Sequence, residues 1–217
     1  MFKNIKTIFF DFDGTLHNGK KVYIPAFKEG YKYLVENGYA DEKEFSSQEV
    51  AMWLGYNEKD MWNTFMPNLP ESIQKKASKI IGSTMDKLVE KGEASLFDES
   101  IDTLKYLKEK GYTLLFLSNC TESYKDFSII NFKLQDYFDD YLTAERFNNI
   151  PKEDIIKKVM SKYKMDMVMI GDRFHDIKAG KENDLYTIGC SYGYGSKDEL
   201  KEADTIIASI GELKNIL

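Results

Sequence analysis

Residues 7–20 read TIFFDFDGTLHNGK, an apolar run that ends in two carboxylates, Asp11 and Asp13, followed at once by Gly14. A short apolar run of this kind is typical of a strand buried in a sheet. Carboxylates at the mouth of such a strand are desolvated, and they repel each other unless a cation lies nearby. The two side chains leave the same side of the chain if the segment stays extended, and diverge if the chain turns at Asp13. The pair is therefore either a polar Asp-Gly turn that closes a strand or part of an acidic functional site.

Short apolar runs recur along the chain and have the length of buried parallel strands. They are TLLFLS (113–118), DYLTA (140–144, the weakest), DMVMIG (166–171), LYTIGC (185–190) and DTIIAS (204–209). Amphipathic helical patterns lie between them, such as one that ends at Gly111 and one that starts at Pro151. Because strands alternate with helices, we predict an α/β fold with a doubly wound, mainly parallel sheet.

Residues 18–91 have a different pattern. Their segments IPAFKEGYKYLVENGY, SSQEVAMWLG, EKDMWNTF and ESIQKKASKIIGSTMDKLVEKG are helical in period and show no strand pattern. No repeat or long linker marks a boundary, so the limits follow from this change of pattern alone. We predict a discontinuous α/β core made of residues 1–17 and 92–217, interrupted by an all-helical domain at residues 18–91.

The composition limits the classes of partner. The 217 residues carry 36 acidic and 30 basic side chains, a net charge of −6, which argues against an extended surface for nucleic acid or anionic membranes. Cys120 and Cys190 are too few for a disulfide framework, and no Cys/His spacing typical of a metal site is present. No run of 18 apolar residues occurs. We expect a cytoplasmic protein that binds a small molecule; its oligomeric state is left open.

Polar side chains follow the predicted strands where each one ends. Ser118 and Asn119 follow one strand and Asp172 follows another, with Asp176 four residues later on the same face of a predicted helix start. Lys152 lies at the start of a predicted helix, and the strand that follows this helix ends just before Asp172. Ligands of open α/β sheets bind beyond the carboxyl ends of the strands. The sequence therefore predicts that these groups meet Asp11 and Asp13 at one edge of the sheet.

Four short motifs resemble, in order and spacing, those of the haloacid dehalogenase superfamily. They are DFDGTL (11–16), LSN (117–119), the Pro-Lys of NIPKED (149–154) and GDRFHD (171–176). The helical insertion and the C-terminal tail resemble the phosphoglycolate phosphatase-like and β-phosphoglucomutase-like branch. The resemblance covers the core and is loose over residues 18–91. It implies a Rossmann-like core with a helical cap domain, and a hydrolase of phosphoric monoesters.

The resemblance also implies catalytic roles. Asp11 would be the nucleophile that accepts the phosphoryl group, and Asp13 the general acid and then the base for water. Lys152 would neutralise a phosphoryl oxygen and the Asp11 carboxylate. The phosphoryl group would be held by the Ser118 hydroxyl, the Asn119 backbone N–H and Thr15. Taken without the resemblance, these residues are more typical of turns, caps and a solvated helix start than of a catalytic site.

A magnesium ion is implied at the same place. A phosphate dianion among acidic groups meets a repulsion of about 4 kcal/mol per unit-charge pair at ~4 Å. By resemblance, Mg²⁺ would be held by the carboxylates of Asp11 and Asp172 and by the main-chain carbonyl of Asp13. Asp176 would lie just beyond these ligands. In the structural alternative, Asp172 caps a helix and Asp176 pairs with a lysine.

Other conspicuous residues receive structural interpretations. Cys120 has no histidine near it in the sequence to act as its base, and His175 is expected on a helix surface. Arg173 is expected to form a salt bridge with its neighbour Asp172. The cap aromatics Trp53, Tyr56 and Trp62 are expected in the core of the cap, although any of them could face the cleft.

Three functions remain open at this stage. The leading prediction is an Mg²⁺-dependent phosphatase that hydrolyses a small phosphorylated metabolite through a phospho-aspartyl intermediate. A phosphomutase of the β-phosphoglucomutase type would use the same core, and a non-catalytic binding protein would be expected to lack a motif residue. Dehalogenases of the superfamily lack the second aspartate, so Asp13 argues against dehalogenation. The identity of the substrate is not encoded in these motifs.

Overall fold

A computed structural model describes residues 4–217; residues 1–3, the start of the predicted core segment 1–17, lie outside the described residues. Six parallel strands form one sheet in the order β3-β2-β1-β4-β5-β6. Their bounds are β1 (Thr7–Phe10), β2 (Thr113–Ser118), β3 (Asp140–Thr143), β4 (Met167–Gly171), β5 (Tyr186–Cys190) and β6 (Thr205–Ile207). The predicted α/β fold is confirmed. Since β1 pairs with both β2 and β4, the acidic motif follows a central strand.

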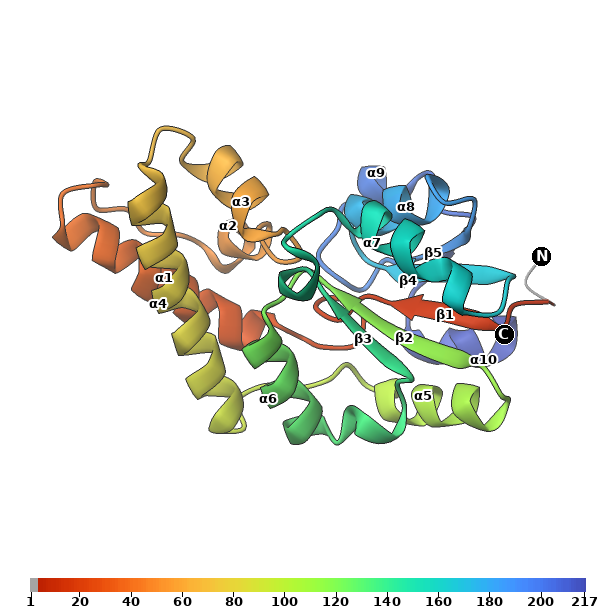
Figure 1. Cartoon of the computed structure of the whole chain (residues 1–217). Helices are drawn as coiled ribbons and strands as arrows, with labels where there is room; N and C mark the ends of the chain where they lie inside the picture. Colours follow the sequence, from red (N-terminus) through yellow and green to blue (C-terminus); the bar gives the residue numbers. More distant parts are fainter. Residues whose placement is uncertain (1–3) are drawn as a thin grey trace.

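Helices cover both faces of the sheet (Figure 1). One face carries α5 (Ser100–Glu109), α6 (Glu122–Phe132) and α10 (Leu213–Ile216), and the other carries α7 (Lys152–Val159), α8 (Phe174–Lys181) and α9 (Lys197–Leu200). Successive strand residues point to opposite faces, so Ile8 and Phe10 pack in one apolar cluster and Phe9 packs in the other. This double burial explains why the strands are apolar throughout rather than alternating.

The insertion after β1 is a helical cap. It consists of α1 (Lys20–Glu36), α2 (Ser47–Ala51), α3 (Glu58–Phe65) and α4 (Glu71–Glu90), and α1 packs along α4. The cap has its own apolar cluster, in which Trp62 is 1% exposed and donates a hydrogen bond from Nε1 to Ser78 Oγ at 2.7 Å. In Figure 1 the cap stands at the end of the sheet toward which β1 runs. The predicted limits of the cap, residues 18 and 91, remain a prediction.

Hydrogen-bonded caps fix where the short cap helices begin. The side chain of Ser46 accepts a bond from the backbone of Glu49, whose carboxylate accepts one back from Ser46 N, and Asn57 caps α3 in the same position. Residues 52–57 are thereby left as a connection between α2 and α3 that faces the core. Across residues 4–217, no helix is both long and apolar enough to span a membrane.

Candidate active site

A buried lysine links two of the acidic groups at the carboxyl end of the sheet. Lys152 Nζ lies 2.6 Å from Asp11 Oδ1 and 2.7 Å from Asp176 Oδ1, and all three side chains are at most 3% exposed. Thr15 Oγ1 lies 3.3 Å from the second oxygen of Asp11 and donates to it. Burial alone would lower the pKa of Lys152, but the charges of Asp11 and Asp176 raise it overall. Lys152 is therefore held as a cation beside Asp11.

Asp172 completes the cluster and is enclosed by glycines. Its Oδ2 accepts a 2.6 Å hydrogen bond from the backbone of Tyr194, while its Oδ1 is buried and has no hydrogen-bond partner among the described residues. A Cβ on Gly14 would lie 2.2 Å from Asp172 Oδ2, and one on Gly193 would lie 2.3 Å from Asp172 Cβ. Neither position has room for a side chain. The chain thus leaves one Asp172 oxygen free while it fixes the other.

The acidic cluster carries more negative charge than the neighbouring Lys152 neutralises. Oxygens of Asp11, Asp172 and Asp176 lie within 4.8 Å of one another. When all three are ionised, Lys152 leaves an excess of two negative charges. Burial, and then the charge of Asp176, raise the pKa of Asp11 to about 7 against the lowering effect of Lys152. Burial and the charges of Asp11 and Asp176 likewise raise the pKa of Asp172 well above its usual value. A divalent cation would balance this excess.

Asp13 points away from the cluster into a second set of contacts. Its Oδ1 lies 2.7 Å from His17 Nδ1 and accepts a 3.0 Å hydrogen bond from the hydroxyl of Tyr124. The His17 side chain is fully buried and stacks on Phe12 at a ring-centroid distance of 5.0 Å. The chain turns at Asp13, so the two aspartates diverge yet line the same pocket. Asp13 is thus held by His17, from the turn that follows β1, and by Tyr124 on α6.

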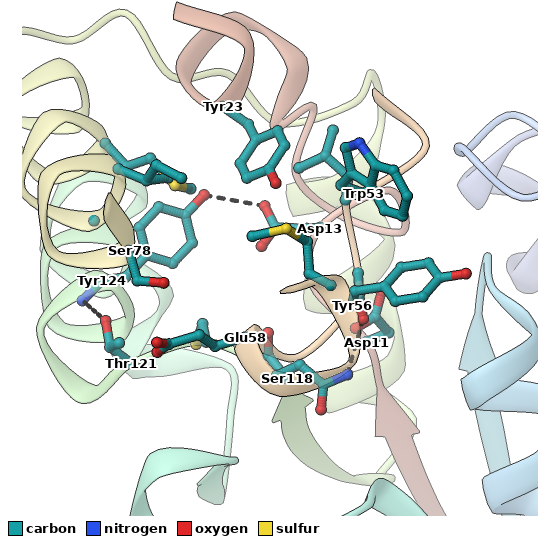
Figure 2. A pocket seen from close by; sticks show the side chains of 18 residues that line it. Asp11, Asp13, Tyr23, Trp53, Tyr56, Glu58, Ser78, Ser118, Thr121 and Tyr124 are labelled. Atoms are coloured by element: carbon teal, nitrogen blue, oxygen red, sulfur yellow. Dashed lines mark hydrogen bonds between the residues drawn. The ribbon is translucent and has the colours of Figure 1, made fainter. Parts of the chain in front are cut away.

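A pocket of about 170 Å³ opens between the core and the cap (Figure 2). The core contributes Asp11, Asp13, the Ser118–Thr121 turn and Tyr124; the cap contributes Tyr23, Trp53, Leu54, Gly55, Tyr56, Glu58, Met61, Ser78, Ile81, Gly82 and Met85. Figure 2 shows the Tyr124 hydroxyl directed at Asp13, with Tyr23, Trp53 and Tyr56 around it on the cap side. The pocket has the acidic groups at its base and cap side chains around it.

The connection between α2 and α3 rests on the core through Arg173. The guanidinium donates to the backbone carbonyls of Met52, at 3.1 Å, and of Leu54, and its carbon lies 5.0 Å from the centre of the Tyr56 ring. Asn119 Nδ2 donates a 2.8 Å bond to the carbonyl of Gly55. The cap is therefore docked onto the same segments that carry Ser118 and Asp172.

The motif order, the acidic cluster and the inserted cap agree with one known family. The sequence model of the haloacid dehalogenase-like hydrolase family matches residues 8–190 of this chain. The chain belongs to this family. Its predicted resemblance to the haloacid dehalogenase superfamily is confirmed, and the protein is a hydrolase.

Relatives of this hydrolase align over almost its full length. Pyrophosphatase PpaX of Anoxybacillus flavithermus is 24% identical over 220 residues, which cover 99% of this chain and 97% of that protein. Phosphoglycolate phosphatase of Vibrio vulnificus is 23% identical over 223 residues, with coverage of 99% and 97%. A solved structure described as a predicted phosphatase from Clostridium acetobutylicum has a TM-score of 0.85 at 25% identity, covering 98% of this chain and 97% of the other.

The structure brings the predicted site residues of the hydrolase into one region. Lys152 and Thr15 contact Asp11, the acids of GDRFHD lie beside it, and the remaining predicted residues line the pocket: Asp13, Ser118 and Asn119. Asn119 uses its side-chain amide for the cap, which leaves its backbone N–H for the predicted phosphoryl contact. Their roles remain predictions.

Several local expectations are wrong. Asp172 does not start a helix, because α8 begins at Phe174 and Arg173 is the N-cap residue. Arg173 forms its salt bridge with Glu199, at 2.8 Å, rather than with Asp172. His175 is half-buried instead of lying on the surface, and this burial lowers its pKa. Trp53 and Tyr56 pack in the apolar cluster of the cap as expected and also line the pocket, whereas Trp62 packs in the same cluster without lining the pocket.

Sequence reasoning missed three residues that contact the site. His17 and Tyr124 bond Asp13, and the Tyr194 backbone positions Asp172. A signal for His17 exists, because it lies four residues after Asp13 inside the first motif region. The glycines on both sides of Tyr194 indicate a tight loop, but not what that loop contacts. Nothing in the local sequence pairs Tyr124 with Asp13.

Proposed function

We propose that this hydrolase is an Mg²⁺-dependent phosphatase that hydrolyses a small phosphorylated metabolite through a phospho-aspartyl intermediate at Asp11. The observation that carries the proposal is the buried contact of Lys152 with Asp11 at 2.6 Å, next to an acidic cluster with an uncompensated charge and below the pocket between core and cap. The relatives named pyrophosphatase and phosphoglycolate phosphatase support it. A cytoplasmic location remains a prediction.

The residues of the pocket would divide the reaction into two displacements. A carboxylate oxygen of Asp11 attacks phosphorus, and the bond to the leaving-group oxygen breaks as Asp13 donates its proton to that oxygen. Asp13, now ionised, then takes a proton from water, which attacks the same phosphorus and releases phosphate and Asp11. Lys152 offsets negative charge beside Asp11 throughout, and donors at Ser118 and Asn119 hold the phosphoryl oxygens.

The acidic cluster fits a hard divalent cation. Every donor is an oxygen, and Asp172 Oδ1 is buried with no partner among the described residues. Asp11, Asp172 and the main-chain carbonyl of Asp13 would hold Mg²⁺, which supplies positive charge that offsets the repulsion between the acids and a phosphate. Both oxygens of Asp176 already accept hydrogen bonds, from Lys152 and from the backbone of Arg173. By the resemblance, Asp176 would lie just beyond the ligands and orient the cluster.

Two functions that share the core receive less support. A phosphomutase that holds a bisphosphorylated intermediate needs cationic partners for its second phosphate, and no Lys or Arg is among the pocket-lining residues that the structure describes. A non-catalytic protein has no use for a buried Lys152–Asp11 pair, which is costly to maintain. We further propose that residues 18–91 act as a cap domain that controls access of the substrate.

Phosphate release from 4-nitrophenyl phosphate tests the proposal. Activity should require Mg²⁺, disappear in a chelator and fall at least ~10³-fold in Asp11→Asn. Asp154→Asn is the matched control, because Asp154 is an exposed aspartate on α7 away from the pocket. Full activity in the chelator or in Asp11→Asn would refute the mechanism. Accumulation of an isomer of a sugar phosphate faster than phosphate release would favour the mutase.

A further inference from the structure

The wall of the pocket above the acidic cluster is mainly apolar. The cap supplies large apolar or aromatic side chains from three helices and the connection 52–57, namely Tyr23, Trp53, Leu54, Tyr56, Met61, Ile81 and Met85. Its polar contributions are Ser78 and Glu58. The phenol groups of Tyr23 and, from the core, of Tyr124 also line the pocket. The wall offers contact area and neutral donors, but no positive charge.

The two nearest buried cations cannot serve a second anionic group. Lys152 is paired with Asp11 and Asp176 beneath the pocket base. Arg173 is 4% exposed, is paired with Glu199 and uses its guanidinium for the carbonyls of the docked connection. Neither lines the pocket. A carboxylate or a second phosphate beyond the reacting phosphoryl group would thus be buried without a cationic partner, which is strongly unfavourable.

Glu58 makes the pocket still less favourable for a negatively charged leaving group. It is the first residue of α3, it is exposed, and it lines the pocket. A negative leaving group would meet the negative charge of Glu58 at the mouth of the pocket. A neutral or positive leaving group would not meet this repulsion. Because Glu58 is solvated, its effect is modest, of the size of other exposed charge pairs.

We propose that the natural substrate is a phosphate monoester whose leaving group is apolar, about the size of one aromatic ring, and free of negative charge. This inference rests on the proposed phosphatase function and adds the substrate class. The cavity of about 170 Å³ has to hold the phosphoryl group as well, which leaves room for a leaving group no larger than about one aromatic ring. On this basis the substrates named for the relatives, pyrophosphate and phosphoglycolate, are poor substrates here, although the relatives share the core and the cap.

Three phenyl phosphates of similar size provide the test. They carry a methyl, a carboxylate or an aminomethyl group at the para position, and kcat/KM is measured for each with Mg²⁺, together with pyrophosphate and 2-phosphoglycolate. We expect the methyl ester to exceed the carboxylate ester and both small anions by at least ~10-fold, the effect of one unpaired anion in an apolar site. The aminomethyl ester should equal or exceed the methyl ester.

Variants at Glu58 show how much of the preference for the methyl ester comes from the charge of Glu58 and how much from the chemistry of the leaving group. Glu58→Gln should narrow the ratio of methyl to carboxylate ester by about 2–5-fold, and Glu58→Lys should narrow it further. Glu29→Gln and Glu29→Lys are the matched controls, because Glu29 is exposed on α1 outside the pocket and should leave the ratio unchanged.

The outcomes distinguish this inference from the function on which it rests. If the carboxylate ester, pyrophosphate or phosphoglycolate is hydrolysed as efficiently as the methyl ester, the proposed substrate class is wrong. The proposed phosphatase function is then still supported. If the ratio of kcat/KM for the methyl and carboxylate esters is unchanged in both Glu58 variants, Glu58 does not contribute to the preference against negative charge. If no ester is hydrolysed in an Asp11-dependent way, the proposed function fails and the substrate class fails with it.

Discussion

At the scale of single residues, the contacts of Asp13 separate it from the other acids. Asp11, Asp172 and Asp176 share one buried cluster, whereas Asp13 is bonded to Tyr124 and His17. Tyr124 also lies 3.1 Å from His17 Nδ1, so the three groups form one small network. A carboxyl that must donate and then accept a proton needs a fixed orientation toward the leaving oxygen. We interpret Tyr124 and His17 as positioning residues for Asp13.

Replacing Tyr124 by Phe should test this interpretation. The change keeps the ring and removes the contacts of the hydroxyl with Asp13 and His17, a loss of about 1–2 kcal/mol or roughly 5–30-fold in rate. We expect kcat to fall by about that factor with little change in KM, and the pH profile of kcat to shift. Tyr31→Phe is the control, since its hydroxyl bonds the Asp41 carbonyl within the cap. A purely structural role of Tyr124 would lower stability without moving the pH profile.

A second residue-scale prediction concerns Gly14. Its φ of +93° and the 2.2 Å approach of an added Cβ to Asp172 Oδ2 mean that Gly14→Ala combines backbone strain with displacement of a carboxylate. Gly38→Ala adds similar strain, at φ +72°, with nothing within 4 Å. Gly38→Ala should lose about 1–2 kcal/mol of stability in urea unfolding, and Gly14→Ala should lose more, because the Asp172 carboxylate must also move. Only Gly14→Ala should raise the Mg²⁺ concentration needed for half-maximal activity; equal Mg²⁺ requirements would contradict the placement of Asp172 as a ligand.

At the scale of elements, the sequence predicted the core better than the site. The strand positions were predictable because both faces of the sheet are buried, which leaves continuous apolar runs such as TLLFLS. The acidic motif and Lys152 were placed correctly at the sheet edge because parallel strands end together. Contacts between cap and core were not predictable. Arg173 meets the carbonyls of Met52 and Leu54, more than a hundred residues away in the chain, and no local pattern encodes that meeting.

Removal of Arg173 should weaken the docking of the cap. Arg173→Met keeps an apolar stem but loses the bonds to the connection 52–57 and the pair with Glu199. We expect KM to rise several-fold and the fluorescence of Trp53, which lines the pocket, to change toward that of a solvated indole. Arg146→Met is the control, because Arg146 pairs with Asp140 at the edge of the core and Arg146 and Arg173 are the chain's two arginines. Unchanged fluorescence and KM would show that this contact does not hold the cap.

The Arg173–Glu199 pair also predicts a dependence of stability on pH. Burial raises the pKa of Glu199, but the hydrogen bond and charge of Arg173 outweigh it and lower the pKa below the usual 4.5. A carboxyl with a lowered folded-state pKa contributes stability above its unfolded pKa and loses it as the pH falls through the folded-state value. The melting temperature of the protein should therefore exceed that of Glu199→Gln at pH 7, and the difference should shrink below about pH 4.5. A difference that is constant with pH would contradict the pairing.

At the scale of the whole molecule, a bound phosphoryl mimic should raise the melting temperature of the protein. Beryllium fluoride with Mg²⁺ imitates a phosphoryl group on a carboxylate, and a ligand at 100 times its Kd adds about 2.7 kcal/mol. For a chain of this size, that corresponds to a rise in melting temperature of roughly 5–11 °C. The rise should require Mg²⁺, vanish in Asp11→Asn and largely persist in Asp13→Asn. The same rise in Asp11→Asn would refute Asp11 as the nucleophile.

The position of β1 at the centre of the sheet has a consequence for synthesis of the chain on the ribosome. β1 emerges first, but its neighbours β2 and β4 begin only at Thr113 and Met167. The helices of the cap, which end at Glu90, emerge before either neighbour, so they can pack on one another first. Asp11, in contrast, meets its contacts only when Lys152, Asp172 and the Tyr194 loop have emerged. The nascent protein therefore keeps one side of β1 unpaired until β4 has emerged, and its acidic site stays incomplete until the Tyr194 loop follows.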